Sequence, residues 1–470
     1  MTEDWPLPEG FIVSLNHRTR RRDGGRTLIG GAPTRVLYLS PAGAGLLREG
    51  TLRVTDRETA FLADRLLESG IADPVVGALP EIDPADLTYV IPVRDRPEPL
   101  NRLLASIGRR GRVIVVDDAS RDAEATRAVA ARHGAEIILL PHNLGVGGAR
   151  NEGLSRVTTP YVAFVDSDVV LPPDAMPTML RHFADPRVAV VAPRVVGLTG
   201  TASGTWITRY EDALSSLDLG RHPATVRPRA VVSWVSGTTL VARANAIGAG
   251  FTSTTRAGED VDFVWRLAKE GFRIRYEPSA LVEHEHRSSV HEWISRKAFY
   301  GTGASWLAQR HPESIAPAIL SPWGTALVLA LAVQRRWSIP LAVVIFAATA
   351  ARISRKLSRS ERPVVTALEL TASGALAAIT QATSLLLRHW WPVVAIVAPC
   401  SRRLRRAVVL AHFVDSATQH LRTRPQLDPV RFALARRLDD LAYGAGVWFS
   451  ALRSRSLRAL IPDLRARSKV

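Results

Sequence analysis

Cysteine is almost absent from this sequence. Cys400 is the single cysteine among 470 residues, which excludes an intramolecular disulfide and a cysteine-rich metal site. Such a composition fits a reducing compartment. An apolar run near the start is also lacking, because the first ten residues, MTEDWPLPEG, are acidic and hold no continuous apolar stretch. The sequence therefore predicts no secretory signal peptide.

Acidic residues are too few to balance the basic ones. Asp and Glu number 44 against 61 Lys and Arg, which gives a net charge of +17 at pH 7. The excess is concentrated in residues 401–470, where 15 basic residues face 5 acidic ones. A basic tail of this kind indicates either nucleic acid or an anionic membrane surface as a partner.

The length of the chain predicts two or three domains. Residues 7–75 have the pattern of a small winged-helix-like domain, with a Pro- and Asp-rich linker after it. The stretch LYLSPAGAGLL within it resembles the small peptide-recognition domain of ribosomal-peptide modification systems. A DNA-binding or purely structural winged helix stays open as the alternative. The expected elements are short strands at 11–15, 27–29 and 36–39, a helix after Ser40-Pro41, and a helix over 56–69.

From residue 86 to 315 the pattern changes to strands that alternate with helices. TYVIPV, RVIVVD, AEIILL and YVAFV are apolar runs, and helical segments separate them. This alternation predicts a mostly parallel sheet with helices on both faces, in the α/β class. The carboxyl ends of parallel strands meet at one edge, where ligands bind in such folds.

Two carboxylates one residue apart follow the strand YVAFV. Asp166 and Asp168 flank Ser167, so they deliver hard oxygen ligands to the carboxyl edge of the sheet. Hard oxygens suit Mg²⁺ or Mn²⁺, and such ions keep positions open for substrate phosphates. Taken alone, the pair also fits a polar turn after a core strand.

Several motifs occur together in one order. VIPVRDRPEPL, VIVVDDAS, NLGVGGARNEGL, FVDSD and AGEDVDFVWRLAKEG resemble a family 2 glycosyltransferase, which has the GT-A nucleotide-sugar-binding fold. The glycine-rich stretch lacks the dinucleotide spacing G-x-G-x-x-G, and no Gly-Lys-Ser/Thr of a phosphate-binding P-loop follows it. We therefore expect a nucleotide-sugar site rather than a dinucleotide or ATP site.

The resemblance assigns roles to individual residues. It implies that Asp260 is the catalytic base, although acidic residues in a first helical turn also complement the helix dipole. It implies a divalent ion, Mg²⁺ or Mn²⁺, held by Asp166 and Asp168, with His284 or His286 as a further ligand or a structural hydrogen-bonding group. Arg150 and Arg266 are expected to meet phosphate oxygens or brace the site, and Asp118 to accept from uracil or ribose. The substrate-binding set is Pro92, Asp118, Arg150, Asn151, Asp166, Gly237, Glu259 and Arg266.

Apolar runs follow the catalytic segment. Residues 316–334, 337–351, 364–387 and 390–399 are rich in apolar side chains, and a membrane span needs about 20 such residues. We expect membrane-associated helices over 316–400 and a basic amphipathic tail over 401–470 on an anionic leaflet. This predicts a cell-membrane protein with a cytoplasmic catalytic domain and no nucleic-acid partner. Buried core helices are the alternative.

The predicted function is inverting transfer of a sugar from a nucleotide diphosphate. The family resemblance implies glucose from UDP-glucose, a redox cofactor derived from a ribosomal peptide as the acceptor, and a β-1,4-linked glucose oligomer as the product. A membrane glycosyltransferase for a cell-envelope polysaccharide or a lipid-linked acceptor is the enzymatic alternative. The alternative of another class is a non-catalytic membrane scaffold that binds a peptide.

Overall fold

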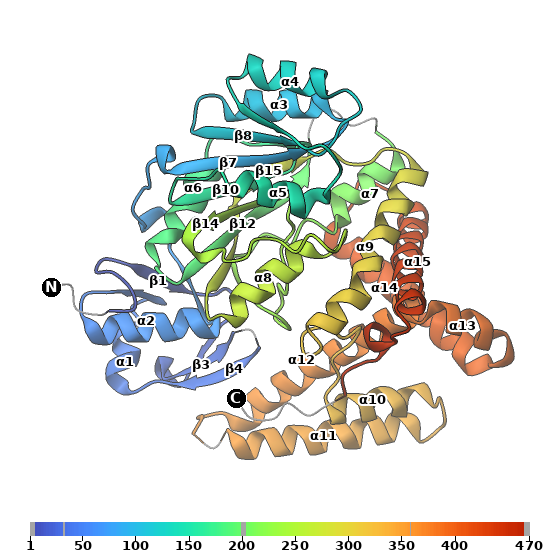
Figure 1. Ribbon diagram of the computed structural model, residues 1–470. Helices are drawn as coiled ribbons and strands as arrows, with labels where there is room; N and C mark the ends of the chain where they lie inside the picture. The colour runs from blue at the N-terminus through green and yellow to red at the C-terminus, as the bar shows by residue number, and fades with distance from the viewer. Residues whose placement is uncertain (1–4, 32, 199–203, 358, 465–470) are drawn as a thin grey trace. The chain divides into compact units, whose positions relative to one another are not determined.

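Two compact units make up the chain. The computed structural model describes residues 5–31, 33–198, 204–357 and 359–464. One unit comprises Met1–Ser203 with Ser215–His286, and the other comprises Gly204–Leu214 with Arg287–Val470. The first holds the predicted N-terminal module and the predicted nucleotide-sugar fold, and the second is built from helices (Figure 1).

A nine-stranded mixed sheet forms the centre of the first unit. Strands β10, β7, β8 and β9 lie side by side in that order and are parallel. β14 lies antiparallel between β10 and β12, and β15 runs parallel to β12. The short strands β11 and β13 pair with β15. The bounds are β7 Leu87–Val93, β8 Arg112–Asp117, β9 Glu136–Leu139, β10 Tyr161–Val165, β11 Val169–Val170, β12 Val188–Gly197, β13 Ala224–Val226, β14 Thr239–Arg243 and β15 Arg273–His284.

The prediction of a mostly parallel sheet is wrong for the second half of this sheet. Four of the eight strand pairings are parallel and four are antiparallel. The strand–helix alternation that signals parallel crossovers is regular only as far as β10. A strand that arrives without a crossover helix carries no sign of its direction in its sequence.

Helices cover both faces of the sheet. α3, α4 and α6 contribute Leu104, Val129 and Met179 to a hydrophobic core shared with the strands. α5 packs closely on the other face, since a Cβ on Gly153 would lie 2.3 Å from Val90 Cγ1. Phe263 of α8 stacks on Phe251 with ring centroids 4.3 Å apart. The bounds are α3 Pro97–Ile107, α4 Ala123–Arg132, α5 Gly145–Leu154, α6 Ala175–Arg181 and α8 Glu259–Lys269.

The N-terminal module has two small sheets and two helices. One sheet has the order β5-β1-β6 and the other β2-β3-β4, and both helices occur where the sequence predicted them. Asp56 and Thr59 form a capping box at the start of α2, and Gly70 ends this helix with φ of 69°. The bounds are β1 Ile12–Leu15, β2 Arg20–Arg22, β3 Thr27–Gly30, β4 Arg35–Tyr38, α1 Pro41–Leu46, β5 Thr51–Arg53, α2 Arg57–Ser69 and β6 Ala72–Pro74.

Ion pairs fasten this module to the catalytic fold. The guanidinium of Arg273, which is 1% exposed, lies 2.5 Å from Asp64 of α2 and 2.8 Å from Asp185. Arg187 reaches Asp64 at 3.4 Å and Glu68 at 3.1 Å. The module has its own apolar core, but it supplies carboxylates that buried arginines of its neighbour need. It is therefore less separable than its linker composition predicts.

Helices α9 (Val290–Arg310) and α15 (Pro429–Arg453) form the core of the second unit. A Cβ on Gly446 would lie 1.9 Å from the Ala298 carbonyl oxygen, so the two backbones are in contact. Lys297 is buried between Glu211 at 2.9 Å and Asp439 at 3.4 Å. The other helices are α7 Trp206–Leu214, α10 Pro322–Ala332, α11 Ser338–Lys356, α12 Pro363–Ser384, η6 Leu385–His389, α13 Trp391–Val397 and α14 Arg402–Thr423.

The prediction of one amphipathic surface tail over 401–470 is wrong for α15. Asp439, Val447 and Ala451 on this helix are buried, whereas Leu410 and Phe413 of α14 are each 65% exposed. Core and surface helices share the same periodicity, so the sequence does not distinguish the two. Residues 465–470 of the predicted tail lie outside the described residues.

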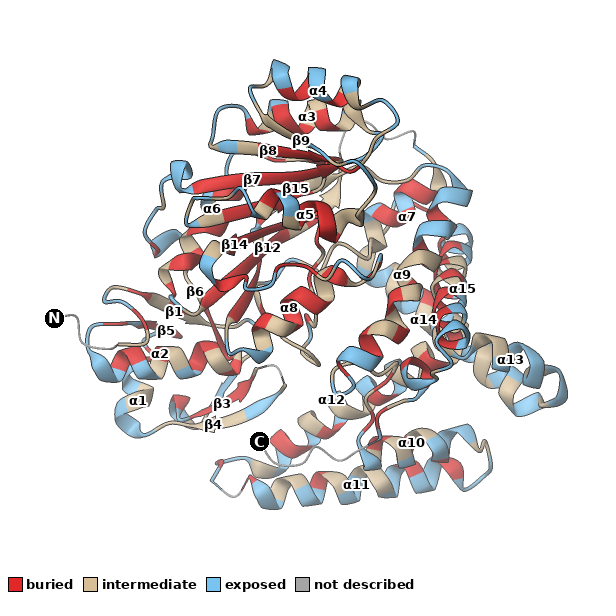
Figure 2. Cartoon of the chain, in the orientation of Figure 1, coloured by how far each residue is buried: buried red, intermediate tan, exposed pale blue. Residues whose placement is uncertain are grey.

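Exposed apolar side chains occur on α11 and α12, as they also do on α14 and α15. Ile339, Val344 and Leu376 are 69%, 61% and 67% exposed, and much of both helices is coloured as exposed or intermediate in Figure 2. The segments Ser338–Lys356 and Pro363–His389 are long and apolar enough to cross a membrane, by length and composition only.

We expect Asp64→Asn to lower the free energy of unfolding by about 1–3 kcal/mol, because it leaves a buried guanidinium with one carboxylate fewer. Thermal or denaturant unfolding of the full chain measures this change. Glu58→Gln, in the exposed first turn of the same helix, is the matched control and should cost at most about 0.5 kcal/mol. Equal stability of the two variants would contradict the fastening role.

Candidate active site

The site lies at the edge of the sheet where the parallel strands end. Asp166 and Asp168 follow β10, and the Asp166 amide donates to the Thr238 carbonyl at 2.9 Å, just before β14 begins. β7 leads to Arg96 and β15 ends at His284. Because β7, β10 and β15 run in the same direction, their carboxyl ends deliver these side chains to one edge.

Asp168 has two cationic or potentially cationic neighbours. Arg96 Nη1 lies 2.6 Å from one carboxylate oxygen, and His284 Nε2 lies 3.4 Å from the other. The register of β11 with β15 pairs Val169 with His284, which explains why this histidine reaches the carboxylate. Arg96 was not among the predicted site residues, although it lies in the short turn between β7 and α3 that follows a carboxyl strand end.

Arg150 is buried at the centre of the site. Its side chain is 1% exposed and its Nη2 donates to Asp166 Oδ1 and to the Gly237 carbonyl, each at 2.7 Å. Glu259 lies 3.5 Å from Nη1. Burial alone would lower the pKa of Arg150, but the surrounding carboxylates raise it, so this residue stays charged. The structure thus gives Arg150 the bracing position.

Gly237 links this arginine to the predicted base. Its carbonyl accepts from Arg150 and its amide donates to Asp260 Oδ2 at 2.8 Å. A Cβ on Gly237 would lie 2.8 Å from Arg150 Nη1 and 3.1 Å from Asp260 Cβ. A continuous set of hydrogen bonds therefore connects Asp166 to Asp260, and only glycine fits at its centre.

Glu259 and Asp260 begin α8 but have different surroundings. Glu259 is 7% exposed. Burial raises its pKa to about 7, with a further contribution from Asp260 and an opposing one from Arg150. Asp260 is half-buried and also accepts from the Val261 amide at 2.8 Å. Below about pH 7 the Glu259 carboxyl is therefore mostly protonated.

Two neighbouring carboxylates at the end of β8, Asp117 and Asp118, have different hydrogen-bond partners. Both oxygens of Asp118, the predicted acceptor from base or ribose, already accept from the amides of Leu144 and Gly145 at 2.6 and 3.0 Å. Asp118 thereby holds the start of α5. Asp117 Oδ2 is buried and has no hydrogen-bond partner among the described residues. Asp117, which the candidate set left out, is the carboxylate with acceptor capacity to spare.

Three further predicted residues act on the backbone of the site. Asn151 accepts from the Phe251 amide at 2.7 Å and donates to its carbonyl at 2.8 Å. Arg266 donates to the carbonyls of Gly250 and Ile247. Pro92 is buried in β7 and pairs with Val116 of β8. It lies beyond Val90, the last residue of β7 that pairs with β10. These contacts fix the loop before α8 and the end of β7.

Asp166 and Asp168 fit a divalent ion that takes few of its ligands from the protein. Among the described residues no group of three or more His, Cys, Asp and Glu side chains converges as a metal-binding cluster. Asp168 and Asp166 offer two hard carboxylates, and Mg²⁺ is commonly bound through one or two carboxylates plus substrate phosphates. His284 Nδ1 has no hydrogen-bond partner in the described part of the chain. The donor set fits such an ion and does not form a closed protein cage.

Comparison with known proteins identifies the family. A family model described as "Glycosyl transferase family 2" matches residues 88–235. The pre-mycofactocin glycosyltransferase of Mycobacterium tuberculosis (strain CDC 1551 / Oshkosh) is 41% identical over 471 residues, which cover 98% of this chain and 99% of that protein. The poly-beta-1,6-N-acetyl-D-glucosamine synthase of Staphylococcus aureus (strain COL) is 26% identical over 188 residues, or 39% of this chain and 44% of that protein.

A solved structure is also similar. The mannosyltransferase PcManGT from Pyrobaculum calidifontis, in complex with GDP-Man and Mn²⁺, covers 63% of this chain and 87% of its own at 20% identity, with a TM-score of 0.37. That TM-score is too low to support a conclusion about the site. The 41% identity extends over nearly all of both chains, and the family model covers the strands that carry Asp166 and Asp168. This chain therefore belongs to glycosyltransferase family 2, with the GT-A fold, and groups there with the pre-mycofactocin glycosyltransferases.

Proposed function

We propose that this glycosyltransferase transfers a hexose, glucose from UDP-glucose, with inversion onto mycofactocin or its precursor, a redox cofactor derived from a ribosomal peptide. The observation that carries the proposal is the connected set of Asp166, Arg150, Gly237 and Asp260. It joins a pair of carboxylates suited to the donor diphosphate with a carboxylate suited to the acceptor. The product under this proposal is a β-1,4-linked glucose oligomer.

The donor half of the reaction uses the strand ends. Asp166 and Asp168, with His284 as a further candidate, would hold Mg²⁺ or Mn²⁺, which neutralises charge on the leaving diphosphate when bound. Arg96 lies beside Asp168 and is a candidate to meet phosphate oxygens. Asp117 Oδ2 is a candidate to accept from an N–H of the nucleobase, because it has no other partner among the described residues.

The acceptor half uses Asp260. The acceptor hydroxyl oxygen bonds to the anomeric carbon while the bond from that carbon to the diphosphate oxygen breaks. The hydroxyl proton passes to the Asp260 carboxylate, and attack opposite the leaving group inverts the anomeric centre. The Gly237 amide holds Asp260 in place, and Glu259, protonated below about pH 7, does not compete for the proton there.

The N-terminal module is the candidate reader of a peptide-derived acceptor. β4 is an edge strand of the sheet β2-β3-β4, and an extended peptide can add to such an edge through main-chain hydrogen bonds. The exposed apolar helices α11 and α12 favour a second candidate function, transfer to a lipid-linked acceptor of the cell envelope. Under either function the catalytic domain is proposed to be cytoplasmic at the cell membrane.

Two substitutions separate the donor and acceptor roles. We expect Asp168→Asn to weaken Mn²⁺-dependent UDP-glucose binding by about tenfold or more, since an ion-binding carboxylate is lost. We expect Asp260→Asn to leave donor affinity within about twofold and to reduce kcat by about 100-fold or more, since a base acts only in the chemical step. Calorimetry and turnover with a pre-mycofactocin acceptor measure these effects.

Asp122→Asn, at the exposed N-cap of α4, is the control for both variants and should change neither quantity. Full turnover in Asp260→Asn would remove the base assignment. Unchanged donor affinity in Asp168→Asn with Mn²⁺ present would remove the ion from the proposal. Turnover with a lipid-linked acceptor alone would favour the second candidate function.

The exposed apolar helices α11 and α12 indicate that the protein inserts into membranes, which gives a separate prediction. We expect the full chain to stay with anionic membranes in 1 M salt, because charge attraction is screened within about 3 Å there whereas apolar insertion is not. Val344→Asp with Leu376→Asp, both on exposed positions, should move the protein to the soluble fraction. Leu452→Asp is the matched control, since Leu452 on α15 is also 67% exposed. Release of the unmodified protein by salt alone would contradict insertion.

A further inference from the structure

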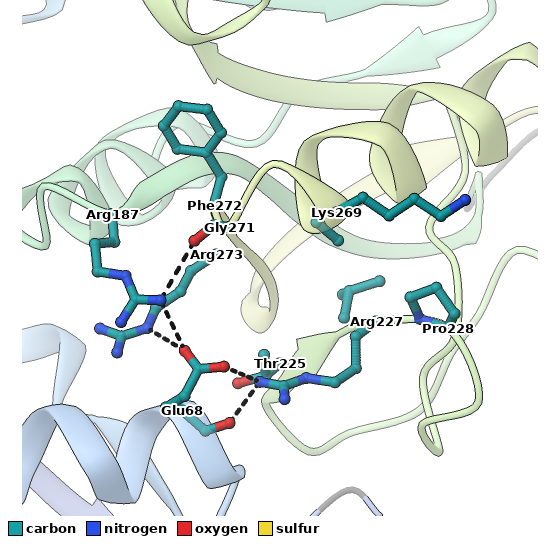
Figure 3. A pocket seen from close by; sticks show the side chains of 11 residues that line it. Glu68, Arg187, Thr225, Arg227, Pro228, Lys269, Gly271, Phe272 and Arg273 are labelled. Atoms are coloured by element: carbon teal, nitrogen blue, oxygen red, sulfur yellow. Dashed lines mark hydrogen bonds and ion pairs between the residues drawn. The ribbon is translucent and has the colours of Figure 1, made fainter. Parts of the chain in front are cut away.

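A cavity of about 160 Å³ lies where the N-terminal module meets the catalytic fold, within the first unit. It is lined by Glu68 of α2, the residue Arg187 before β12, the segment at β13, the end of α8 and the start of β15 (Figure 3). At about 30 Å³ per water, this volume has room for about five waters or one small polyatomic ion.

Positive charge dominates the wall of this cavity. Arg187, Arg227, Lys269 and Arg273 line it, and Glu68 is the one carboxylate among its lining residues. Figure 3 shows Glu68 between Arg187 and Arg273 on one side and Arg227 on the other. Asp64 and Asp185, which lie outside the lining, also pair with Arg187 and Arg273, so the excess of cations over carboxylates belongs to the lining alone.

The contacts to Glu68 are long for ion pairs. Its carboxylate lies 3.1 Å from Arg187, 3.4 Å from Arg227 and 3.5 Å from Arg273. Charge-assisted hydrogen bonds between such groups are usually about 2.7–2.9 Å. Arg227 Nη2 also donates to the Glu68 backbone carbonyl at 2.6 Å and Arg187 Nη2 to the Gly271 carbonyl at 3.3 Å. Each guanidinium carries five N–H donors, so these contacts leave donors available.

Arg273 has a specific unsatisfied donor. The residue is 2% exposed, and its Nη atoms are bound by Asp64 and Asp185. Its Nε has no hydrogen-bond partner among the described residues, with Glu68 at 3.5 Å. A buried donor left without a partner destabilises the fold, so a ligand that accepts there stabilises it.

The lowered pKa of Arg227 agrees with the positive charge of the cavity lining. Burial lowers its pKa, and although Glu68 opposes this, Arg35, Arg273 and Arg187 lower it further. An added anion would reverse the effect of these neighbouring cations. This direction agrees with the long contacts and the unsatisfied Nε.

The cavity is far from the candidate active site. Arg273 begins β15 and His284 ends it. Their partners on β12, Val188 and Gly197, are nine residues apart, which at about 3.3 Å per residue spans about 30 Å, so the two sites lie at opposite ends of β15. A ligand in the cavity is therefore not the donor diphosphate.

We propose that this cavity binds a small oxyanion, a phosphate or carboxylate group, held by Arg187, Arg227 and Arg273. Such an ion sits between α2 and the catalytic fold, and its binding strengthens their attachment. A free phosphate and the terminal carboxylate of a peptide share this chemistry, and the experiment distinguishes these two sources.

The test measures thermal unfolding of the full chain against inorganic phosphate at constant ionic strength. The expected result is a saturable rise in Tm. Arg227→Gln should weaken phosphate binding by about tenfold or more, whereas Arg65→Gln, an exposed cation on α2, should leave it unchanged. Glu68→Gln should strengthen it, because the competing carboxylate is removed. A purely structural role for Glu68 would not produce this opposite sign.

A second arm replaces phosphate with a short peptide that has a free C-terminal carboxylate, compared with its amide. Stabilisation by the acid, absent in Arg227→Gln, identifies a peptide carboxylate as the source, and stabilisation by phosphate alone identifies free phosphate. If Arg227→Gln fails to fold, Arg227→Lys should still weaken phosphate binding and Glu68→Gln should still strengthen it. No saturable response to either probe, or an equal response in Arg227→Gln and Arg65→Gln, overturns the proposal.

Discussion

The buried guanidinium of Arg150 is the constraint on which the site depends. A cation that is 1% exposed is tolerated only when anions and acceptors surround it closely. Asp166 and the Gly237 carbonyl accept hydrogen bonds from its Nη2, and Glu259 lies 3.5 Å from its Nη1. Satisfying one desolvated charge thereby fixes the end of β10, the start of α8 and the turn before β14. Stability and the geometry for chemistry have the same source here.

Arg273 plays a comparable part at the opposite end of the strands, where β15 begins. It is buried, and its partners Asp64 and Asp185 come from the module and from the catalytic fold. The same principle that organises the site also fastens the N-terminal module, which contributes carboxylates to its neighbour rather than apolar surface alone. A module attached in this way can present an acceptor from a fixed position.

The sequence predicted strands, helices and acidic motifs well because each has a local signal. The apolar run before Asp166 and the capping residues of α2 are examples. Hydrogen-bond partners distant in sequence have no such signal. Asn151 binds Phe251, 100 residues away, and Asp118 accepts from the amide of Leu144 before α5, 26 residues away. The direction of β14 and the burial of α15 were missed because periodicity reports amphipathicity, not packing partner or strand direction.

Gly237→Ala tests the central claim most directly, because an added Cβ would press on both Arg150 and Asp260. We predict that kcat falls by about tenfold or more, since the added Cβ displaces Asp260 and also Arg150, which braces Asp166. Gly77→Ala, where a Cβ would have no neighbour within 4 Å, is the control and keeps full turnover. Wild-type kcat in a folded Gly237→Ala protein would contradict the claim that this network positions the base.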